Sequence, residues 1–450
     1  MSVVSELADR TVGTVERSGG RIFDILVTQN RATTAEVEKG SMKQAASMMD
    51  SGVAIRVFDR GSSGFAYCSG HADADMEKAA ELAVSQARAG VPDPDFKGLP
   101  VAEKVTFRQG LYDKSIASLQ PDEAVDMLLT LTDVAEDDRR ISSVNAGLTV
   151  AVCEAALRNS NGLSLSQETT LFEVFSETVA REGDMMFSGL EYASSRRLDK
   201  SSLETVGRSA REHAVRGLVQ KKIETGDLPV IMDPLASGYV LAQAVGGGVN
   251  AESVQRKRSY LSGKLGETIG AEGFSVLDDP TMEWAVGSTS FDGEGTPSLK
   301  KSVIESGVLK SYLHDSYTAG KDSMASTGNS SRGDAVWSYR SPPSISFSNL
   351  VVAKGDATTE EMIRDTGRGV YLRLTLDNPN LATGEFSGLM MESCMIEHGE
   401  LGATIRQATV GIGLLEMFSR IDMVGSESRS AFGVETPAIR ISSAKVGGSA

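Results

Sequence analysis

Short β-rich segments joined by tight turns recur along this chain, and they restrict its fold more than any other feature of the sequence. Two-residue turns separate apolar runs at Ser306–Gly307 and at His398–Gly399, and the stretch NSNG, residues 159–162, is a further turn. Turns this short join antiparallel neighbours, because parallel strands need a long crossover connection. The sequence therefore predicts sheets that are built largely from antiparallel strands.

Helices are also predicted, mostly in the first half. Residues 5–17 place apolar side chains at helical spacing, and the runs RIFDILVTQN and ATTAEVEKGS after them predict two strands around an Asn-Arg turn. Further helices are predicted at residues 73–90, at 121–138 with Pro121 in the first turn, and at about 203–220. The first half therefore mixes helices with strands, whereas the second half is mostly antiparallel strand.

The length of 450 residues favours two domains, since it exceeds what one hydrophobic core usually supports. The segment KKIETGDLP is the best candidate linker, and it places the boundary near Lys222. We predict an α+β fold in which residues 1–221 form a mixed α/β N-terminal domain. Residues 222–450 are expected to form a mainly antiparallel-β C-terminal domain.

Charge and composition exclude several classes of partner. With 61 acidic and 45 basic side chains the net charge is -16, which repels the phosphate backbone of a nucleic acid. No run of eighteen apolar residues and no signal-peptide core occurs, and the three cysteines show no C-x-x-C spacing. The expectation is a cytoplasmic protein with no nucleic-acid partner and no membrane contact.

A glycine-rich helix opens the second half. Asp233 and Pro234 are a typical N-cap and first-turn pair, and they predict a helix over about residues 234–252. Gly246, Gly247 and Gly248 follow in succession, and each costs about 1 kcal/mol relative to alanine inside a helix. Either the helix ends at these glycines or another part of the chain packs closely against them.

Few side chains outside this helix suggest chemistry. His71, His213, His314 and His398 have no second His or Cys at helical metal spacing. His314 with Asp315 could act as a ligand or base, although an ordinary strand-end histidine is the simpler interpretation; His213 and His398 are expected at the surface. Cys394 is expected to be a core thiol. The basic residues Arg256, Lys257, Arg258 and Lys264 could bind an anion, but internal salt bridges fit an acidic chain better.

Several motifs occur in an order that resembles one known family. They include EVEKGSMKQAASMMDSGVAIRVF and DPDFKGLP in the first half, then YLSGKLGE, STGNSSR, SNLVVAKGD, TGEFSG and IRQATVGIGLLEMFSRI. This order resembles the TldD/PmbA family of peptidase subunits, also called modulators of DNA gyrase. The likeness covers nearly the whole chain.

The glycine-rich helix distinguishes the two branches of that family. In the TldD branch this helix carries the zinc motif H-E-x-x-x-H, followed three residues later by a glutamate. Here those positions are Ala242, Gln243 and Gly247, and the last is Asn250. Alanine and glycine have no side-chain donor atom, and the amide of glutamine is not basic. The chain therefore resembles the PmbA (TldE) branch, which implies no catalytic residue, no metal ligand and no cofactor in this chain.

Two hypotheses about function follow from the resemblance. In the first, the chain is a metal-free, non-catalytic subunit that pairs with a TldD-type zinc subunit, and the complex degrades unfolded peptides. Candidate peptide or interface residues are then Arg256, Lys257, Arg258, His314 and Asp315. In the alternative, the chain is a stand-alone homodimeric peptidase or metallopeptidase that uses residues outside the lost motif, with His314, Asp315, His398 and Cys394 as the available groups.

Overall fold

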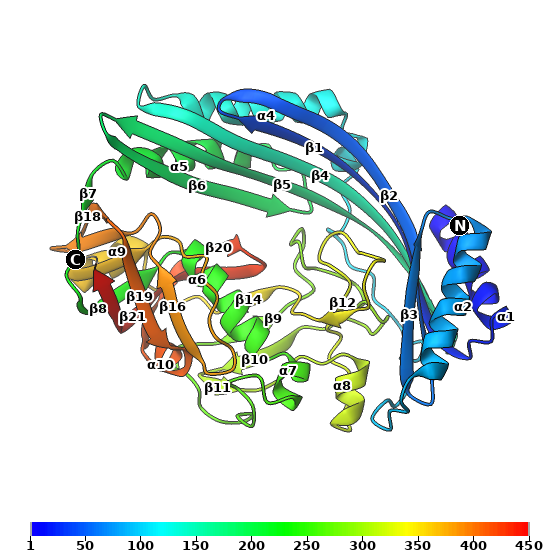
Figure 1. The fold of residues 1–450 in the computed structure, drawn as a ribbon. Helices are drawn as coiled ribbons and strands as arrows, with labels where there is room; N and C mark the ends of the chain where they lie inside the picture. The colour runs from blue at the N-terminus through cyan, green and yellow to red at the C-terminus, as the bar shows by residue number, and fades with distance from the viewer. Residues whose placement is uncertain (1, 449–450) are drawn as a thin grey trace.

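A bent antiparallel sheet forms most of the first half of the molecule and arches over the second half (Figure 1). The computed structural model describes residues 2–448. The strands of this first sheet lie in the order β3-β2-β1-β4-β5-β6. Their bounds are β1 (Ile22–Glu38), β2 (Ser41–Asp59), β3 (Ser62–Ser69), β4 (Ile141–Asn159), β5 (Ser164–Glu182) and β6 (Met185–Ser195).

The predicted turn at Asn30 and Arg31 is wrong. Strand β1 runs through both residues and is paired on both sides, with β2 and with β4. The chain turns instead at Lys39 and Gly40, which have φ values of 53° and 74°. The Asn30 side chain donates a hydrogen bond to the backbone carbonyl of Trp337, 307 residues away, so the residue that suggested a turn is held inside the sheet by a distant contact.

Helices cover one face of the first sheet, and the second half of the molecule covers part of the other. Phe23, Ile25 and Val27 alternate along β1 and pack with the two helices at one end of the sheet. The intervening Leu26 faces the opposite way and packs with Trp337. The helices of the first half are α1 (Val3–Arg17), α2 (Asp73–Ala89), α3 (Lys114–Ser118), α4 (Pro121–Glu136) and α5 (Ser201–Arg216).

The second half is built around a larger mixed sheet, in which antiparallel pairings predominate. Among residues 2–448 its parallel pairings are β14 with β21, β15 with β8, and β18 with β7. Its strands are β7 (Gln220–Lys221), β8 (Gly226–Met232), β9 (Val276–Asp278), β10 (Lys301–Glu305), β11 (Val308–Leu309), β14 (Leu350–Val352), β15 (Arg368–Leu372), β16 (Glu385–Leu389), β17 (Cys394–Glu397), β18 (Glu400–Ile405), β19 (Ala408–Gly413), β20 (Ile421–Ala431) and β21 (Val434–Gly448). A separate pair is formed by β12 (Ser330–Ser331) and β13 (Ser344–Ile345).

The predicted α+β class is confirmed, and so are two of its hairpins. Ser306 and Gly307, with φ values of 47° and 75°, join β10 to β11, and His398 and Gly399, with 55° and 77°, join β17 to β18. Left-handed backbone at both central residues is what a two-residue hairpin requires. The predicted boundary near Lys222 falls where the chain passes from α5 into the second sheet, and it stays a prediction.

The helices of the second half are short and lie between strands. They are α6 (Pro234–Leu241), the π-helix η1 (Ala242–Gly247), α7 (Ala251–Gln255), α8 (Ser316–Lys321), α9 (Thr359–Thr366) and α10 (Leu414–Ser419). Within the described residues, no helix is long and apolar enough to cross a membrane. Strand β8 leads directly into α6, so the second sheet positions the glycine-rich helix.

Candidate functional site

The glycine-rich helix does not end before its glycines, because it widens there into a π-helical turn. The Asp233 carboxylate accepts a hydrogen bond from the backbone N–H of Leu235 at 2.8 Å and caps α6, with Pro234 in the first turn. From Ala242 to Gly247 the backbone is π-helical, with hydrogen bonds between residues five apart. Positions 242 and 247 therefore lie one π turn apart, whereas a regular α-helix would turn them away from each other.

Bulky side chains pack directly against Gly246 and Gly247. A Cβ atom added at Gly246 would lie 2.3 Å from Cδ1 of Phe347, and one added at Gly247 would lie 2.8 Å from Cδ1 of Leu381. These separations are shorter than van der Waals contact, so a larger residue would displace its neighbour. The close packing that the sequence suggested is present, and it accounts for glycine at both positions.

Two hydroxyl groups hold the widened turn in place. The Tyr260 hydroxyl donates a hydrogen bond to the carbonyl oxygen of Ala244 at 2.9 Å, and the Ser259 hydroxyl donates one to the carbonyl of Gly248 at 2.5 Å. Both donors belong to the segment that follows α7. Because carbonyls near the end of a helix lack partners inside it, these bonds stabilise the π turn and the end of the helix.

The side chains at the four motif positions do not fit a zinc ion. Ala242 and Gly247 offer no donor atom, and Gln243 offers only a neutral amide. Asn250 caps α7: its Oδ1 accepts hydrogen bonds from the N–H groups of Glu252 and Ser253, and its Nδ2 donates to the carbonyl of Ile345. Residues 2–448 contain no group of three or more His, Cys, Asp or Glu side chains arranged to hold a metal.

The basic turn after the motif lies at the surface. Arg256, Lys257 and Arg258 are exposed. Arg256 pairs with Glu252 at 2.8 Å, and Lys264 pairs with Glu267 at 3.2 Å. Two of the four basic residues therefore form local ion pairs, as an acidic chain favours, and each such exposed pair contributes at most about 1 kcal/mol.

His314 and Asp315 both make hydrogen bonds that belong to the local fold. His314 is 2% exposed, its backbone N–H bonds Thr327, and burial lowers the pKa of its imidazole. Its Nδ1 has no hydrogen-bond partner. The Asp315 carboxylate caps α8 by accepting from the N–H of Thr318 at 2.8 Å, and burial raises its pKa. His314 follows Leu313, which forms only an isolated β-bridge, so the predicted strand does not end here, and the candidate role of the pair stays a prediction.

The other candidate groups of the stand-alone hypothesis lie in different settings. His398 is exposed in the β17–β18 turn, as expected. Cys394 is 2% exposed, and burial raises the pKa of its thiol, which matches the expected core role. Among the described residues, no hydrogen bond joins either side chain to His314 or Asp315. They therefore do not form a nucleophile-base arrangement.

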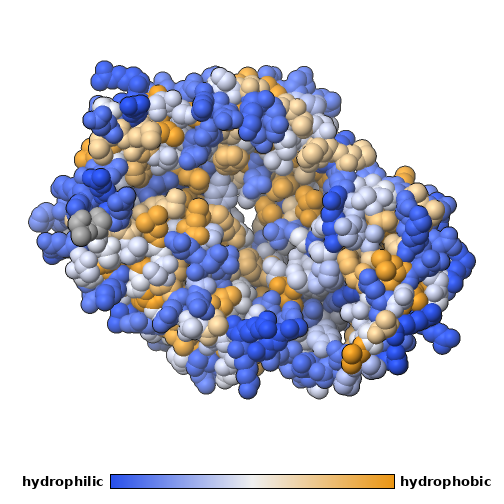
Figure 2. Space-filling view, in the orientation of Figure 1, coloured by the Kyte–Doolittle hydropathy of each residue, from blue (hydrophilic) through white to orange (hydrophobic). Residues whose placement is uncertain are grey.

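A cavity of about 610 Å³ lies between the concave face of the first sheet and the second half. Aromatic side chains form much of its wall, and Figure 2 shows a narrow opening with hydrophobic residues around it in this region. Phe347, which packs on Gly246, is one wall residue. Phe432 is another; its ring lies 4.9 Å from Tyr192 of β6 and 5.1 Å from Tyr239 of α6. The cavity therefore borders the π turn.

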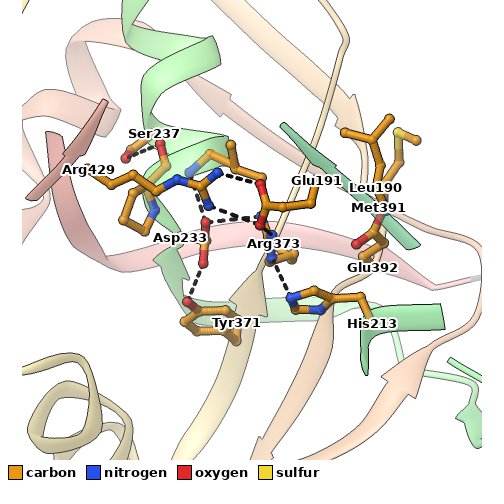
Figure 3. Close-up of polar contacts among 12 residues, drawn as sticks. Leu190, Glu191, His213, Asp233, Ser237, Tyr371, Arg373, Met391, Glu392 and Arg429 are labelled. Carbon is orange, nitrogen blue, oxygen red and sulfur yellow. Dashed lines mark hydrogen bonds and ion pairs between the residues drawn. The ribbon is translucent and has the colours of Figure 1, made fainter. Parts of the chain in front are cut away.

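A buried charged cluster fixes the start of the motif helix (Figure 3). The Arg373 guanidinium donates to Glu191 at 2.7 Å, to Asp233 at 3.3 Å and to His213 at 3.1 Å. Arg429 also pairs with Glu191, and the Tyr371 hydroxyl donates to Asp233 at 2.6 Å. We call these six residues the Arg373 cluster. Glu191 and His213 come from the first half, so the cluster ties both halves to the residue that caps α6.

Sequence reasoning missed this cluster and misplaced one of its members. The expectation that His213 lies at the surface is wrong: its ring is half-buried and accepts a hydrogen bond from Arg373. Burial, together with the positive charge of Arg373, lowers the pKa of His213 to about 3, so the imidazole is neutral. The only local signal was Asp233 before Pro234, because the other partners are distant in sequence.

Comparison with known proteins shows that three domain models of one protein family match successive parts of this chain. Family models described as PmbA/TldA metallopeptidase domain 1, central domain and C-terminal domain match residues 23–87, 114–218 and 225–448. The first two models lie on the strands and helices of the first sheet, and the third covers the second sheet with the π turn.

Individual relatives show the same breadth of likeness. The metalloprotease PmbA homolog of Haemophilus influenzae is 24% identical, with 95% of this chain and 93% of that protein covered. The metalloprotease TldD homolog of the same organism is also 24% identical, with 92% and 90% covered. The crystal structure of TldE from Thermococcus kodakarensis has a TM-score of 0.89 at 22% identity and covers 98% of this chain and 100% of that one, which shows a shared fold. The identity to the PmbA homolog equals the identity to the TldD homolog, so overall identity does not separate the two branches. The residues at the motif positions are the feature that distinguishes them.

Proposed function

Because this chain belongs to the PmbA/TldD metallopeptidase family, we propose that it is the metal-free, non-catalytic subunit of a two-subunit peptidase that degrades unfolded peptides. In this proposal a TldD-type subunit supplies the zinc ion and the catalytic residues. The two subunits form a cytoplasmic heterodimer, and this chain contributes part of the space in which the peptide lies.

The proposal depends mainly on the residues that occupy the four motif positions in and beside the π turn. Ala242 and Gly247 lack donor atoms, Leu381 fills the space beside Gly247, and Asn250 is committed to capping α7. A zinc hydrolase needs three ligands and a base that activates water. None of the four positions supplies either function, which supports assignment to the TldE-like branch.

The cavity beside the π turn supports a role in holding peptide. Its volume of about 610 Å³ lies in the range of ligand sites, and its wall combines aromatic rings with the carboxylates of Glu173 and Asp334. An extended peptide recognised through its backbone and apolar side chains suits a cavity of this kind. The basic turn, with Arg256, Lys257 and Arg258 exposed, offers surface that a partner can contact.

Metal analysis combined with a cleavage assay tests the proposal. We expect the purified chain to hold no stoichiometric zinc and to leave an unstructured peptide intact, and we expect cleavage when a TldD-type zinc subunit is added. As a control, the zinc subunit is assayed in the absence of this chain. One zinc per chain together with chelator-sensitive cleavage by this chain alone would contradict the proposal and favour the stand-alone peptidase.

A further inference from the structure

A second cavity, of about 360 Å³, lies where the edge strand of the first sheet meets two connections of the second sheet. One connection joins β16 to β17, and the other joins β18 to β19. Its volume falls in the range of sites for small ligands. The apolar part of its wall consists of Phe187, Leu190, Leu389, Met390, Met391 and Ile405.

A buried carboxylate also lines this cavity. Glu392 is 8% exposed, and its Oε1 accepts a hydrogen bond from the backbone N–H of Leu190 at 2.8 Å. Its Oε2 is buried and has no hydrogen-bond partner. Buried polar atoms nearly always have a partner, so an orphaned carboxylate oxygen on a residue that lines a cavity points to a ligand that supplies one.

None of the neighbouring cations hydrogen-bonds Oε2 of Glu392, including Arg406, which lines the same cavity but is exposed. The Arg373 guanidinium uses its three nitrogens on His213, Asp233 and Glu191. Arg429 is also paired with Glu191. Burial raises the pKa of Glu392 to about 7, Glu191 and Asp233 add to the rise, and Arg373 opposes it. The ionised carboxylate therefore lacks a hydrogen-bonded cation of its own.

We propose that this cavity binds a primary ammonium group that is attached to an apolar chain. The ammonium donates to Oε2 of Glu392, and the chain lies against the leucine and methionine side chains. An ammonium is a compact cation that can bond a single oxygen, whereas a guanidinium prefers both oxygens of a carboxylate. Because Oε1 is already bonded to Leu190, the site favours an ammonium. Methionine side chains adapt to apolar groups of different shape.

Two sources carry this chemistry: the N-terminus of a peptide and a lysine side chain. The amine site is independent of the proposed function, since it is built by this chain alone; only the statement that the amine belongs to a peptide rests on that proposal. The cavity is also distinct from the aromatic cavity beside the π turn, with which it shares the wall residue Leu190.

Calorimetric titration of the purified chain with three short peptide amides separates the sources. The sequence Leu-Ala-Ala amide has a free N-terminus, its acetylated form has no amine, and acetyl-Leu-Ala-Lys amide has only the lysine amine. We expect one of the two amine-bearing peptides to bind at least about ten-fold more tightly than the neutral one, as a charged hydrogen bond provides. Equal binding of all three, or binding of none, would overturn the proposal.

Two matched variants locate the binding site. Glu392→Gln keeps an oxygen for Leu190 but removes the charge, and we expect it to weaken binding of the preferred peptide at least about ten-fold. Glu77→Gln removes an exposed carboxylate on α2 that lines neither cavity, and it should leave the affinity unchanged. Circular dichroism checks that both variants fold. Unchanged affinity in Glu392→Gln would contradict the site, and it would leave the metal-free subunit proposal standing because no partner or cleavage enters this assay.

Discussion

At the scale of single residues, burial of Glu392 links the stability of the fold to pH. The folded-state pKa of about 7 exceeds the ordinary value near 4.3. Below about pH 4 the Glu392 carboxyl is protonated in both the folded and the unfolded state, so it adds no pH dependence to the free energy of unfolding. Between about pH 4.3 and 7 the unfolded chain ionises first, so the free energy of unfolding falls, by about 4 kcal/mol in total. Above pH 7 the loss is complete.

We therefore predict that Glu392→Gln is more stable than the native chain at pH 8 by up to about 3 kcal/mol, relative to their difference at pH 4.5. Glutamine does not titrate, so the variant escapes the loss. Urea unfolding of both proteins at pH 4.5, 6 and 8 measures this, with Glu77→Gln, at an exposed position of α2, as the control. A native chain and variant that lose stability in parallel over this range would show that the Glu392 pKa is ordinary.

At the scale of helices and strands, the sequence predicts the elements that depend on their own residues and fails where distant contacts decide the structure. The turn at Ser306–Gly307 was predictable because these two residues themselves adopt the left-handed backbone that a two-residue hairpin requires. The turn at Asn30 was wrongly predicted because Asn30 is held by Trp337, far away in the chain. The π turn likewise depends on distant side chains, Phe347 and Leu381. A local pattern cannot report contacts of this kind.

The candidate site divides in the same way. The four motif positions could be named from the family resemblance, and the missing donor atoms follow directly from residue type. The Arg373 cluster could not be named, since Arg373 and Glu191 lie 182 residues apart. Nor could the orphaned oxygen of Glu392, which depends on where β6 meets the β16–β17 connection. Acid and base residues are common in any sequence, and only the fold decides which of them are buried together.

The π turn makes restoration of the zinc motif a sharp test at this scale. In Ala242→His, Gln243→Glu, Gly247→His the two imidazoles lie one π turn apart, so their geometry suits a shared ion. We nevertheless predict that this triple variant is less stable than the parent by about 1–3 kcal/mol, because a side chain at position 247 meets Leu381. It should bind zinc weakly, since the third ligand and the supporting hydrogen bonds are absent.

Adding Leu381→Ala to the triple variant provides the matched control. The smaller residue removes the contact with position 247, so we expect part of the lost stability to return while zinc binding stays weak. Thermal melting with a zinc titration measures both quantities. Tight zinc binding by either variant, with cleavage of an unstructured peptide, would indicate a preformed catalytic site and would argue against a subunit role.

On the scale of the whole molecule, buried ion pairs join the two halves at two places. Arg56 of the first sheet pairs with Glu294 of the second half at 2.7 Å, and Arg332 pairs with Asp24 at 2.7 Å. The Arg373 cluster is the second place, where Arg373 of the second half reaches Glu191. The first sheet therefore covers the second half as a fixed element, and both cavities lie between surfaces that these pairs hold in register.

We predict that Arg373→Met lowers the free energy of unfolding by about 3–5 kcal/mol, because Glu191 and Asp233 lose a buried cation while methionine keeps a similar length. The control Arg208→Met breaks an exposed pair with Glu204 and should cost less than about 1 kcal/mol. Urea unfolding followed by tryptophan fluorescence reports on the second half, which contains both tryptophans, Trp284 and Trp337, and far-ultraviolet circular dichroism reports on the whole chain. In the native chain the two signals should change together, as one cooperative transition requires. In Arg373→Met they should separate, because the first sheet loses its attachment near α6. Coincident transitions in the variant, at a stability equal to that of Arg208→Met, would show that the cluster does not couple the halves and that packing alone holds the sheet over the cavities.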